Sequence, residues 1–247
     1  MKRSFLCIFV IIILFFMSSC KFIRCNDSEI TPKVVSEIVA NNFYEFKNEV
    51  YIKENNEYVP YIVVTDDYNG NVLLMRKNPL LDKKAFNENT SDLNYYPNSD
   101  IDKFLSIEFF KNFSQEVQNI ILDTSIEVTS YETLIYMDYP WKNEIINRKI
   151  FLLSAAEYGI KSQMTTAEGT EFKVLRDYLT EESEWLRSAY LWESYLCWQI
   201  SSTNEGSEYE NVHRSIRPVF TISPDVKVKI NSELIAGESV YILECDS

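Results

Sequence analysis

Residues 184–198 read EWLRSAYLWESYLCW, and residues 213–220 read HRSIRPVF. Each stretch places an arginine, Arg187 or Arg217, among apolar neighbours, although the chain carries a net charge of -13. An arginine keeps its proton, and leaving it unpaired in a protein interior costs several kcal/mol. Each therefore needs carboxylates or backbone carbonyls as partners. The acidic residues that flank these segments are Glu157, Glu181, Glu182, Glu184 and Glu193.

Around these arginines the second half of the chain is rich in strand-forming residues. β-branched and aromatic runs predict strands at 184–191, 195–202, 215–223, 226–230 and 239–244. The acidic segment 204–211 between them is interpreted as an exposed connection. Helical patterns concentrate in the first half, and this segregation predicts an α+β fold whose second half is mostly antiparallel β.

The chain before residue 100 contains a helix signal, a hairpin signal and a long loop. Thr31 and Pro32 suit the start of a helix that leads into the domain. Asn69-Gly70 supplies the positive φ angles of a two-residue turn between two strand-like runs, which predicts a hairpin. Residues 78–98 are polar and rich in Asn, which is typical of a surface loop that can carry function.

Three further patterns follow between residues 99 and 160. Ser99 or Asp100 suits the N-cap of one short amphipathic helix, and Ser114 suits the N-cap of a second. Residues 125–137 have strand-like composition. Residues 149–160 predict a buried strand that passes, through a capping box of Ser154 and Glu157, into a short helix.

The N-terminus has the pattern of a short export signal. Lys2 and Arg3 precede an apolar run at 5–17, and Ser18 and Ser19 stand directly before Cys20. A helix of that length rises only about 20 Å, against a hydrocarbon core of about 30 Å. Small residues before a cysteine resemble a bacterial lipobox, in which Cys20 is diacylated and becomes the mature N-terminus. An ordinary signal cleaved nearby and an uncleaved anchor are the alternatives.

These signals divide the chain into a signal peptide at 1–19, a lipid-anchored tether with the leading helix at 20–44, and a single α+β domain at 45–247. Loss of Lys2 and Arg3 leaves a mature chain near -15, with 37 acidic residues. Such a charge repels nucleic acid and anionic lipid, so we expect no nucleic-acid partner and membrane attachment through the acyl chains alone. The expected location is the cell envelope, on a bacterial membrane, facing the periplasm or the exterior.

Cysteine and metal chemistry receive little support from the composition. Cys25, Cys197 and Cys245 remain after processing, an odd count that argues against a disulfide framework. Cys197 is interpreted as a small core residue, and a bridge from it to Cys245 stays open. With one histidine, His213, we expect no metal site and no cofactor. Asp66 and Asp67 could indicate calcium, but acidic residues at a hairpin tip are usually solvated.

Several motifs in order resemble a known family. They are FF followed by FSQEVQNII, then IFLLS, WLRS, IRPVFTIS and GESVYIL. This pattern, over roughly residues 45–244, resembles the bacterial domain of unknown function 6273, which has exported and often surface-attached members. The resemblance implies a C-type-lectin-like fold, shared with formylglycine-generating enzymes, and no established activity. The matched positions are Phe151, Leu152, Leu153, Ser154, Trp185, Leu186, Arg187, Ser188, Arg217 and Pro218.

The chain also departs from the family pattern. Asp102 stands where an arginine is common, Phe104 where a tryptophan is common, and Ala189 where proline usually follows WLRS. Only Gly206 remains of the Gly-rich strand region. These changes are compatible with the fold and put the transfer of any specific ligand in doubt.

Two functional interpretations of the arginines follow. In the first, Trp185, Arg187, Ser188, Arg217 and Pro218 form structural networks that tie loops to strands. In the second, the arginines face a groove and hold an anionic or sugar ligand by forked hydrogen bonds. Tyr190, Trp192 and Tyr195 are candidate exposed binding aromatics, of which we expect one or two to reach solvent.

We expect no catalysis. His213 is the only histidine, Glu181 and Glu184 suit a solvated acidic surface, and no cysteine pair has the spacing of an oxidising site. The sequence therefore predicts an exported lipoprotein that acts as a non-catalytic envelope module binding a glycan or a protein. The alternative is a structural or assembly protein of the envelope without a small ligand.

Overall fold

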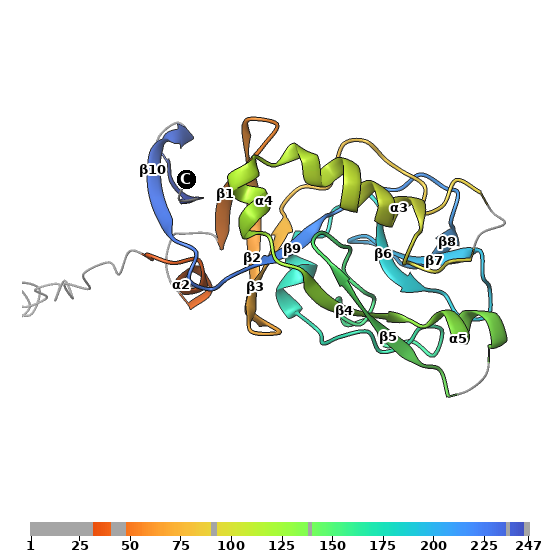
Figure 1. Cartoon of the computed structure of the whole chain (residues 1–247). Helices are drawn as coiled ribbons and strands as arrows, with labels where there is room; N and C mark the ends of the chain where they lie inside the picture. The colour runs from red at the N-terminus through yellow and green to blue at the C-terminus, as the bar shows by residue number, and fades with distance from the viewer. Residues whose placement is uncertain (1–31, 41–47, 90–92, 138–139, 236–237, 245–247) are drawn as a thin grey trace, which may run out of the picture. The chain divides into compact units, whose positions relative to one another are not determined.

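A computed structural model describes residues 32–40, 48–89, 93–137, 140–235 and 238–244 (Figure 1). The predicted lipidation site Cys20, and with it Cys25 and Cys245, lies outside the described residues. The folded unit spans Pro32–Ser247.

The hairpin predicted at Asn69-Gly70 is confirmed and lies in a six-stranded sheet. Asn69 (φ 55°) and Gly70 (φ 80°) form the turn between two antiparallel strands. In order across the sheet, the strands are β10 (Val228–Ile235), β11 (Glu238–Leu243), β1 (Glu49–Glu54), β2 (Glu57–Tyr68), β3 (Asn71–Arg76) and β9 (Val219–Ile222). Neighbours are antiparallel except β1 and β11, which run parallel. The sheet thus joins both ends of the folded unit.

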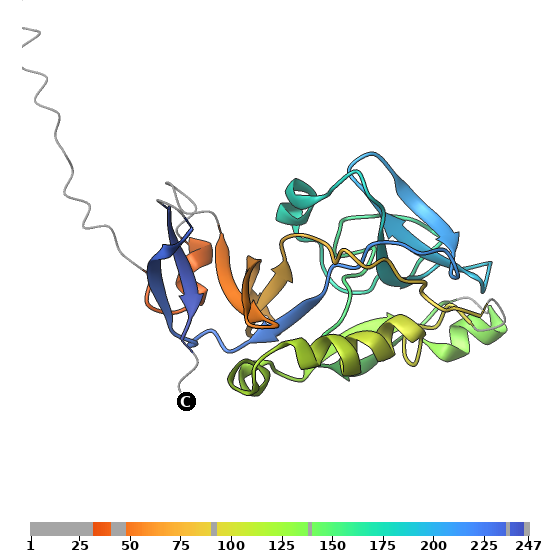
Figure 2. The ribbon, with the colours of Figure 1, turned by 90° about the horizontal axis from the view of Figure 1, so that it is seen from above.

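Both predicted N-caps between residues 99 and 115 are confirmed. Ser99 Oγ accepts a hydrogen bond from Asp102 N, and Ser114 Oγ accepts one from Val117 N. The first helical segment continues through α3 (Asp100–Lys103), the π-helical η1 (Phe104–Glu108) and the 3₁₀-helical η2 (Phe109–Asn112), and the second is α4 (Gln115–Ile120). The Phe113 ring lies 5.5 Å from that of Phe220 in β9, so this segment packs against one edge of the sheet (Figure 2).

Two smaller sheets complete the strands of the described residues. One pairs β4 (Thr124–Thr129) with β5 (Asn143–Arg148), and the other orders β6 (Glu184–Ala189), β7 (Leu196–Ile200) and β8 (Glu205–Tyr209). The interpretation of 204–211 as a connection was wrong, because β8 lies within it. Its acidic side chains are compatible with an edge strand, whose outer side faces water.

The strand-like interpretation of 125–137 was wrong in its second part. The segment divides into β4 and the helix α5 (Tyr131–Tyr136). Ser130 Oγ accepts a hydrogen bond from Thr133 N, and Glu132 lies in the first turn of the helix. This N-terminal capping outweighs the β propensity of the residues inside the helix.

The segment 149–160 forms neither the predicted strand nor the predicted helix. Phe151 makes an isolated bridge to Val219, and the chain then makes a turn at 155–159. The capping box does form, since Ser154 N donates to Glu157 Oε2 at 2.8 Å and Glu157 N to Ser154 Oγ at 3.1 Å. Gly159, at φ 75°, ends the helical geometry after one turn.

Two other predicted segments differ in detail. The leading helix α2 (Ser36–Ala40) begins after Val34, which bridges to Lys227, and Val35 and Ile38 are buried in the core. The loop 78–98 is not wholly at the surface, because Phe86 is fully buried.

Few helices and mostly antiparallel sheets make the fold α+β, as predicted. The described residues contain no helix that has both the length and the apolar character needed to cross a membrane.

Candidate functional site

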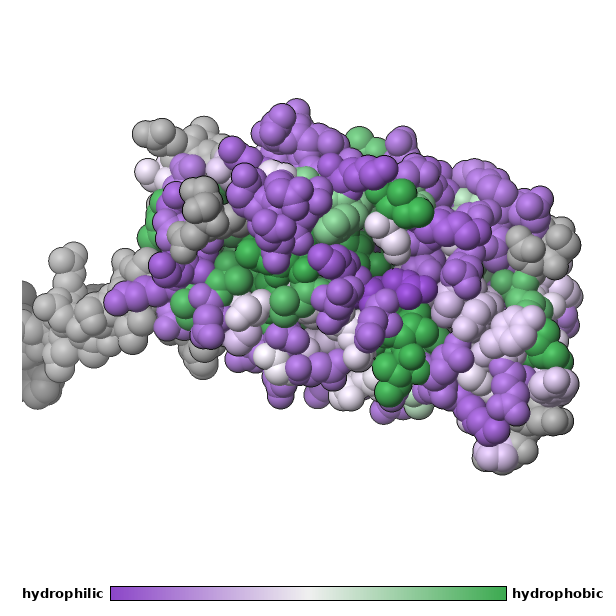
Figure 3. Space-filling model, in the orientation of Figure 1, coloured by the Kyte–Doolittle hydropathy of each residue, from purple (hydrophilic) through white to green (hydrophobic). Residues whose placement is uncertain are grey.

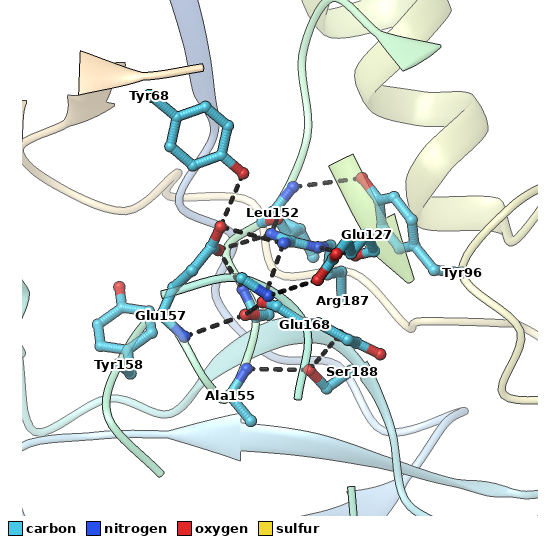
Figure 4. Close-up of polar contacts among 12 residues, drawn as sticks. Tyr68, Tyr96, Glu127, Leu152, Ala155, Glu157, Tyr158, Glu168, Arg187 and Ser188 are labelled. Atoms are coloured by element: carbon cyan, nitrogen blue, oxygen red, sulfur yellow. Dashed lines mark hydrogen bonds and ion pairs between the residues drawn. The ribbon is translucent and has the colours of Figure 1, made fainter. Parts of the chain in front are cut away.

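Arg187 of β6 lies at the centre of a buried polar network (Figure 4). Its Nη1 is 2.6 Å from Glu157 Oε2 and its Nη2 is 3.0 Å from Oε1, and both side chains are fully buried. Nη1 also donates to Leu152 O, Nη2 to Glu168 O, and Nε to Glu127 O. These contacts occupy the five N–H groups of the guanidinium, which leaves none to hold a ligand.

The charge of Glu157 is balanced within the same network. Besides Arg187, its carboxylate accepts hydrogen bonds from Tyr68 of β2 and from Ser154 N. Burial alone would lower the pKa of Arg187, but the adjacent Glu157 carboxylate outweighs it and raises that pKa above its ordinary value. Arg187 therefore keeps its proton, and its contact with Glu157 ties β6 to the turn at 155–159.

A second carboxylate, Glu168, is buried beside this pair. Its Oε1 accepts hydrogen bonds from Thr129 N and Oγ1 and from Thr166 Oγ1, and its Oε2 accepts one from Ser188 Oγ. Burial raises the pKa of Glu168, whereas Arg187 and these donors lower it, and the balance lies above the ordinary value. Ser188 also accepts a hydrogen bond from Ala155 N, so its hydroxyl both donates and accepts within the fold.

Arg217 forms an equivalent pair with Glu184. Its Nε is 2.7 Å from Glu184 Oε2 and its Nη2 is 2.5 Å from Oε1, with both side chains almost fully buried. The remaining donors point at the carbonyl oxygens of Tyr178, Arg76 and Lys77. Arg217 therefore has no donor directed to solvent.

The other two predicted network residues are buried as well. Trp185 Nε1 donates to Lys84 O at 2.9 Å, and Pro218 O accepts from Arg76 N at 3.0 Å. In the described structure, Trp185, Arg187, Ser188, Arg217 and Pro218 all make intramolecular contacts that hold loops to strands. Their geometry supports the structural interpretation of these residues over the ligand-binding one.

The three candidate binding aromatics differ in exposure. Tyr190 packs against the core with its ring 5.7 Å from that of Trp198. Trp192 is 61% exposed, and Tyr195 is also exposed and stacks on Tyr209 at 5.7 Å. Two of the three rings reach solvent because the turn between β6 and β7 interrupts the alternation of the strand.

Trp192 belongs to a cluster that the sequence analysis did not assemble. Its ring is 5.8 Å from that of Trp141 and at 86° to it, and the rings of Tyr95 and Tyr131 lie 5.3 Å apart. Tyr95 and Trp141 both pack against a small apolar core of Leu134, Ala189 and Leu191. We refer to Tyr95, Tyr131, Trp141 and Trp192 as the aromatic cluster. Its members come from four segments, and aromatic spacing along the chain gives no signal that joins them.

The turn that carries Trp192 is strained and firmly held. Trp192 adopts φ 82°, a value that costs a residue with a side chain roughly 1–2 kcal/mol. The buried Asn94 holds this turn, because its Nδ2 lies 2.9, 3.2 and 2.6 Å from the carbonyl oxygens of Tyr190, Glu193 and Leu196. Asn94 thus holds the backbone of the turn that carries the exposed indole.

The surface also contains cavities away from the aromatic cluster. One of them, of about 740 Å³, lies between the β2–β3 turn and the paired strands β4 and β5 and includes Asp67, Asp123 and Glu127. Arg187 lies at its floor with its donors already used. The face in Figure 3 is mostly hydrophilic, with hydrophobic patches over the α3–α4 segment and near β4 and β5. No group of acidic, histidine or cysteine side chains among the described residues is arranged to hold a metal ion.

Cys197 is buried and forms no disulfide within the described residues. Burial, and then the nearby Glu210 carboxylate, raise the pKa of its thiol well above the usual range. The thiol therefore has the environment of a core residue.

Comparison with known proteins identifies one family. The family model described as Domain of unknown function (DUF6273) matches residues 69–224. No curated protein and no solved structure matches the chain. The matched range includes both buried arginines, the glutamates paired with them and the aromatic cluster.

Proposed function

Since the chain belongs to the family Domain of unknown function (DUF6273), a membership that brings no activity with it, we propose its function from its geometry. The protein is a non-catalytic module of the bacterial cell envelope that binds a glycan or a protein through the aromatic cluster. It is exported, and a diacylated Cys20 attaches it to a membrane. Its fold is C-type-lectin-like, with WLRS on β6 and IRPV leading into β9.

The observation that carries this proposal is the exposed Trp192 on a strained, firmly held turn. A soluble domain that buried its rings for stability alone would gain nothing from such a conformation. Strain of this kind is typical of sites where a side chain must be presented in one position. Rigid aromatic side chains lose little conformational entropy on binding and contribute much of the energy at recognition surfaces.

Ion pairing within the fold argues for recognition by aromatic rings rather than by charge. Arg187 and Arg217 use all their donors internally, and Glu157 and Glu184 neutralise them. Because Glu184 is paired with Arg217, it is not free to act with Glu181 as the two carboxylates that a glycoside hydrolase needs. Binding through aromatic rings is also compatible with the strongly acidic chain.

The placement of the cluster suits a tethered protein. The folded unit is entered at Pro32, beside α2. Figures 1 and 2 place α5 and the β6–β7 turn at the end of this unit away from α2. Within the folded unit, Pro32 and the aromatic cluster thus lie toward opposite ends.

Binding of the full chain to glycan and envelope-protein arrays tests the recognition role. The chain is purified in a detergent without a sugar headgroup. Trp192→Ala removes the exposed indole, and Tyr136→Ala is the control, because Tyr136 is 66% exposed on α5 outside the cluster. Recognition predicts that binding falls about tenfold or more in Trp192→Ala only, with an unchanged melting temperature. A wild type that binds neither array favours the structural or assembly role.

The membrane attachment has its own test. Cells that express the wild type or Cys20→Ser are labelled with a radioactive fatty acid, and the protein is then fractionated. Incorporation that depends on Cys20 supports the anchor. Equal or absent labelling in both would show that the leader is an ordinary signal or an uncleaved anchor.

A further inference from the structure

A pocket beside the aromatic cluster differs in chemistry from the rest of this acidic surface. Its volume is about 310 Å³, and it is lined by Asn87, Leu93, Tyr95, Pro97, Asn98, Ser99 and Tyr131. None of these side chains is charged, although charged residues make up 25% of the chain. The larger cavity near Asp67, by contrast, includes several carboxylates. The pocket thus offers no charged side chain to pair with an ionic ligand, which favours neutral ligands.

We propose that this pocket binds one neutral sugar unit of a glycan, with the Tyr131 ring on a face of the sugar and Asn98 on its hydroxyl groups. The inference rests on the proposed function and specifies the class of ligand. A neutral sugar presents apolar C–H faces and several hydroxyl groups. Aromatic rings pack against the C–H faces, and amide groups form hydrogen bonds with the hydroxyl groups. The volume lies at the lower end of the range for small-molecule sites, which suits a short saccharide.

The aromatic wall of the pocket is positioned before any ligand binds. Tyr95 donates its hydroxyl hydrogen to Glu144 of β5, and its ring meets that of Tyr131 edge to face at 67°. Burial, followed by the Glu144 hydrogen bond, raises the pKa of Tyr95. Tyr95 therefore serves as a fixed support, and Tyr131, 51% exposed, presents the accessible ring.

The polar wall is a tight turn. Ser99 N donates to Tyr96 O at 3.0 Å, with Pro97 and Asn98 at the two central positions and Asn98 at φ 67°. Proline followed by asparagine with positive φ is typical of a type II turn. Tyr96 is buried and accepts a hydrogen bond from Leu152 N, which anchors the turn to the core. The side-chain amide of Asn98 is exposed and makes no hydrogen bond to the rest of the described chain, so it is available to a ligand.

The pocket and Trp192 belong to one surface. Tyr95 links them, because it contacts Tyr131 and packs on the same small apolar core as Trp141, whose ring in turn contacts that of Trp192. A glycan longer than one unit would thus occupy the pocket with one sugar and extend toward the indole. Both contacts would contribute to a single binding event.

The test measures affinity of the full chain for neutral and for anionic oligosaccharides. The probes are oligosaccharides of glucose, galactose, mannose and N-acetylglucosamine, with sialylated and sulfated oligosaccharides for comparison. We compare Tyr131→Ala with Tyr136→Ala, which lies on the same helix outside the pocket. Asn98→Gly removes the amide and keeps a residue that tolerates positive φ. We expect Tyr131→Ala and Asn98→Gly each to weaken binding of a neutral probe about tenfold or more, while Tyr136→Ala binds normally.

The possible outcomes separate this inference from the proposed function. If Trp192→Ala loses glycan binding and Tyr131→Ala and Asn98→Gly do not, recognition through the cluster stands and the pocket inference is wrong. Equal or tighter binding of anionic probes would also overturn the neutral-sugar assignment. If the wild type binds no glycan and binds an envelope protein in a Trp192-dependent way, only the glycan inference fails. Melting temperatures of all variants identify any that lose binding through unfolding.

Discussion

Arg187 and Glu157 face each other in a two-pronged ion pair, with N–O distances of 2.6 and 3.0 Å and no exposure of either side chain. They come from β6 and from the turn at 155–159, thirty residues apart in sequence. The pair fixes the turn to the strand where an α-helix was expected from local signals. A buried pair of this kind has consequences for folding that differ from those of surface pairs.

Replacing Arg187 with methionine should destabilise the fold by about 3–5 kcal/mol, because it leaves Glu157 charged and unpaired in the interior. The double variant Arg187→Met/Glu157→Gln should recover a large part of that loss, since no charge then remains buried. Urea unfolding of the wild type, both single variants and the double variant measures the coupling. Purely additive effects would contradict the role of the pair.

Arg217 and Glu184 offer a comparison with an exposed pair. Arg217→Met should cost several kcal/mol, for the same reason as in Arg187→Met. Lys142→Met removes the partner of Glu132 in a solvent-exposed pair at 3.1 Å, which should change the free energy of unfolding by about 0–1 kcal/mol. Urea unfolding measures both variants. Similar losses of unfolding free energy in Arg217→Met and Lys142→Met would show that burial does not decide how much an ion pair contributes.

Glu168 should make the fold less stable as pH rises. Because burial raises its pKa in the folded state, the folded protein holds a proton on Glu168 that the unfolded chain has released. Its contribution is therefore fully present below the ordinary pKa of 4.5 and is lost as pH rises through the folded-state pKa. Glu168→Gln cannot titrate.

The measurement is urea unfolding of both proteins across pH 4 to 8. The stability of the wild type relative to Glu168→Gln should fall as pH rises. The difference in stability between the two proteins cancels the contributions of other carboxyl groups. These include groups such as Asp100, whose pKa is lowered in the fold and whose contribution to stability therefore rises with pH. Parallel stability curves would show that Glu168 has the same pKa in both states.

The positive φ of Trp192 predicts an order of stability among its own variants. Trp192→Gly and Trp192→Ala both remove the ring, but only glycine adopts φ 82° without strain. Trp192→Gly should therefore be more stable than Trp192→Ala by about 1 kcal/mol, measured by thermal unfolding. Both variants should lose partner binding. A more stable alanine variant would mean that the turn relaxes once the indole is removed.

Local signals predicted part of the fold because the hydrogen bonds involved close within a few residues. The Asn69-Gly70 turn, the Ser99 and Ser114 caps and the Ser154–Glu157 capping box are of this kind. Prediction from the sequence failed where local signals conflicted with one another. Residues 131–136 formed a helix because the Ser130 cap outweighed their β-rich composition, and 155–159 made only one turn because Gly159, at φ 75°, ends it.

The sequence by itself determined that Arg187 and Arg217 need carboxylate or carbonyl partners and which flanking glutamates were available to them, because every N–H group of a buried guanidinium needs an acceptor. Only the tertiary structure selected Glu157 for one and Glu184 for the other. It also decided that Tyr95, Tyr131, Trp141 and Trp192, spread over almost a hundred residues, share one surface. The physical reason is that partner choice depends on distances between strands and loops that are far apart in the chain, whereas the need for a partner depends only on the chemistry of the side chain.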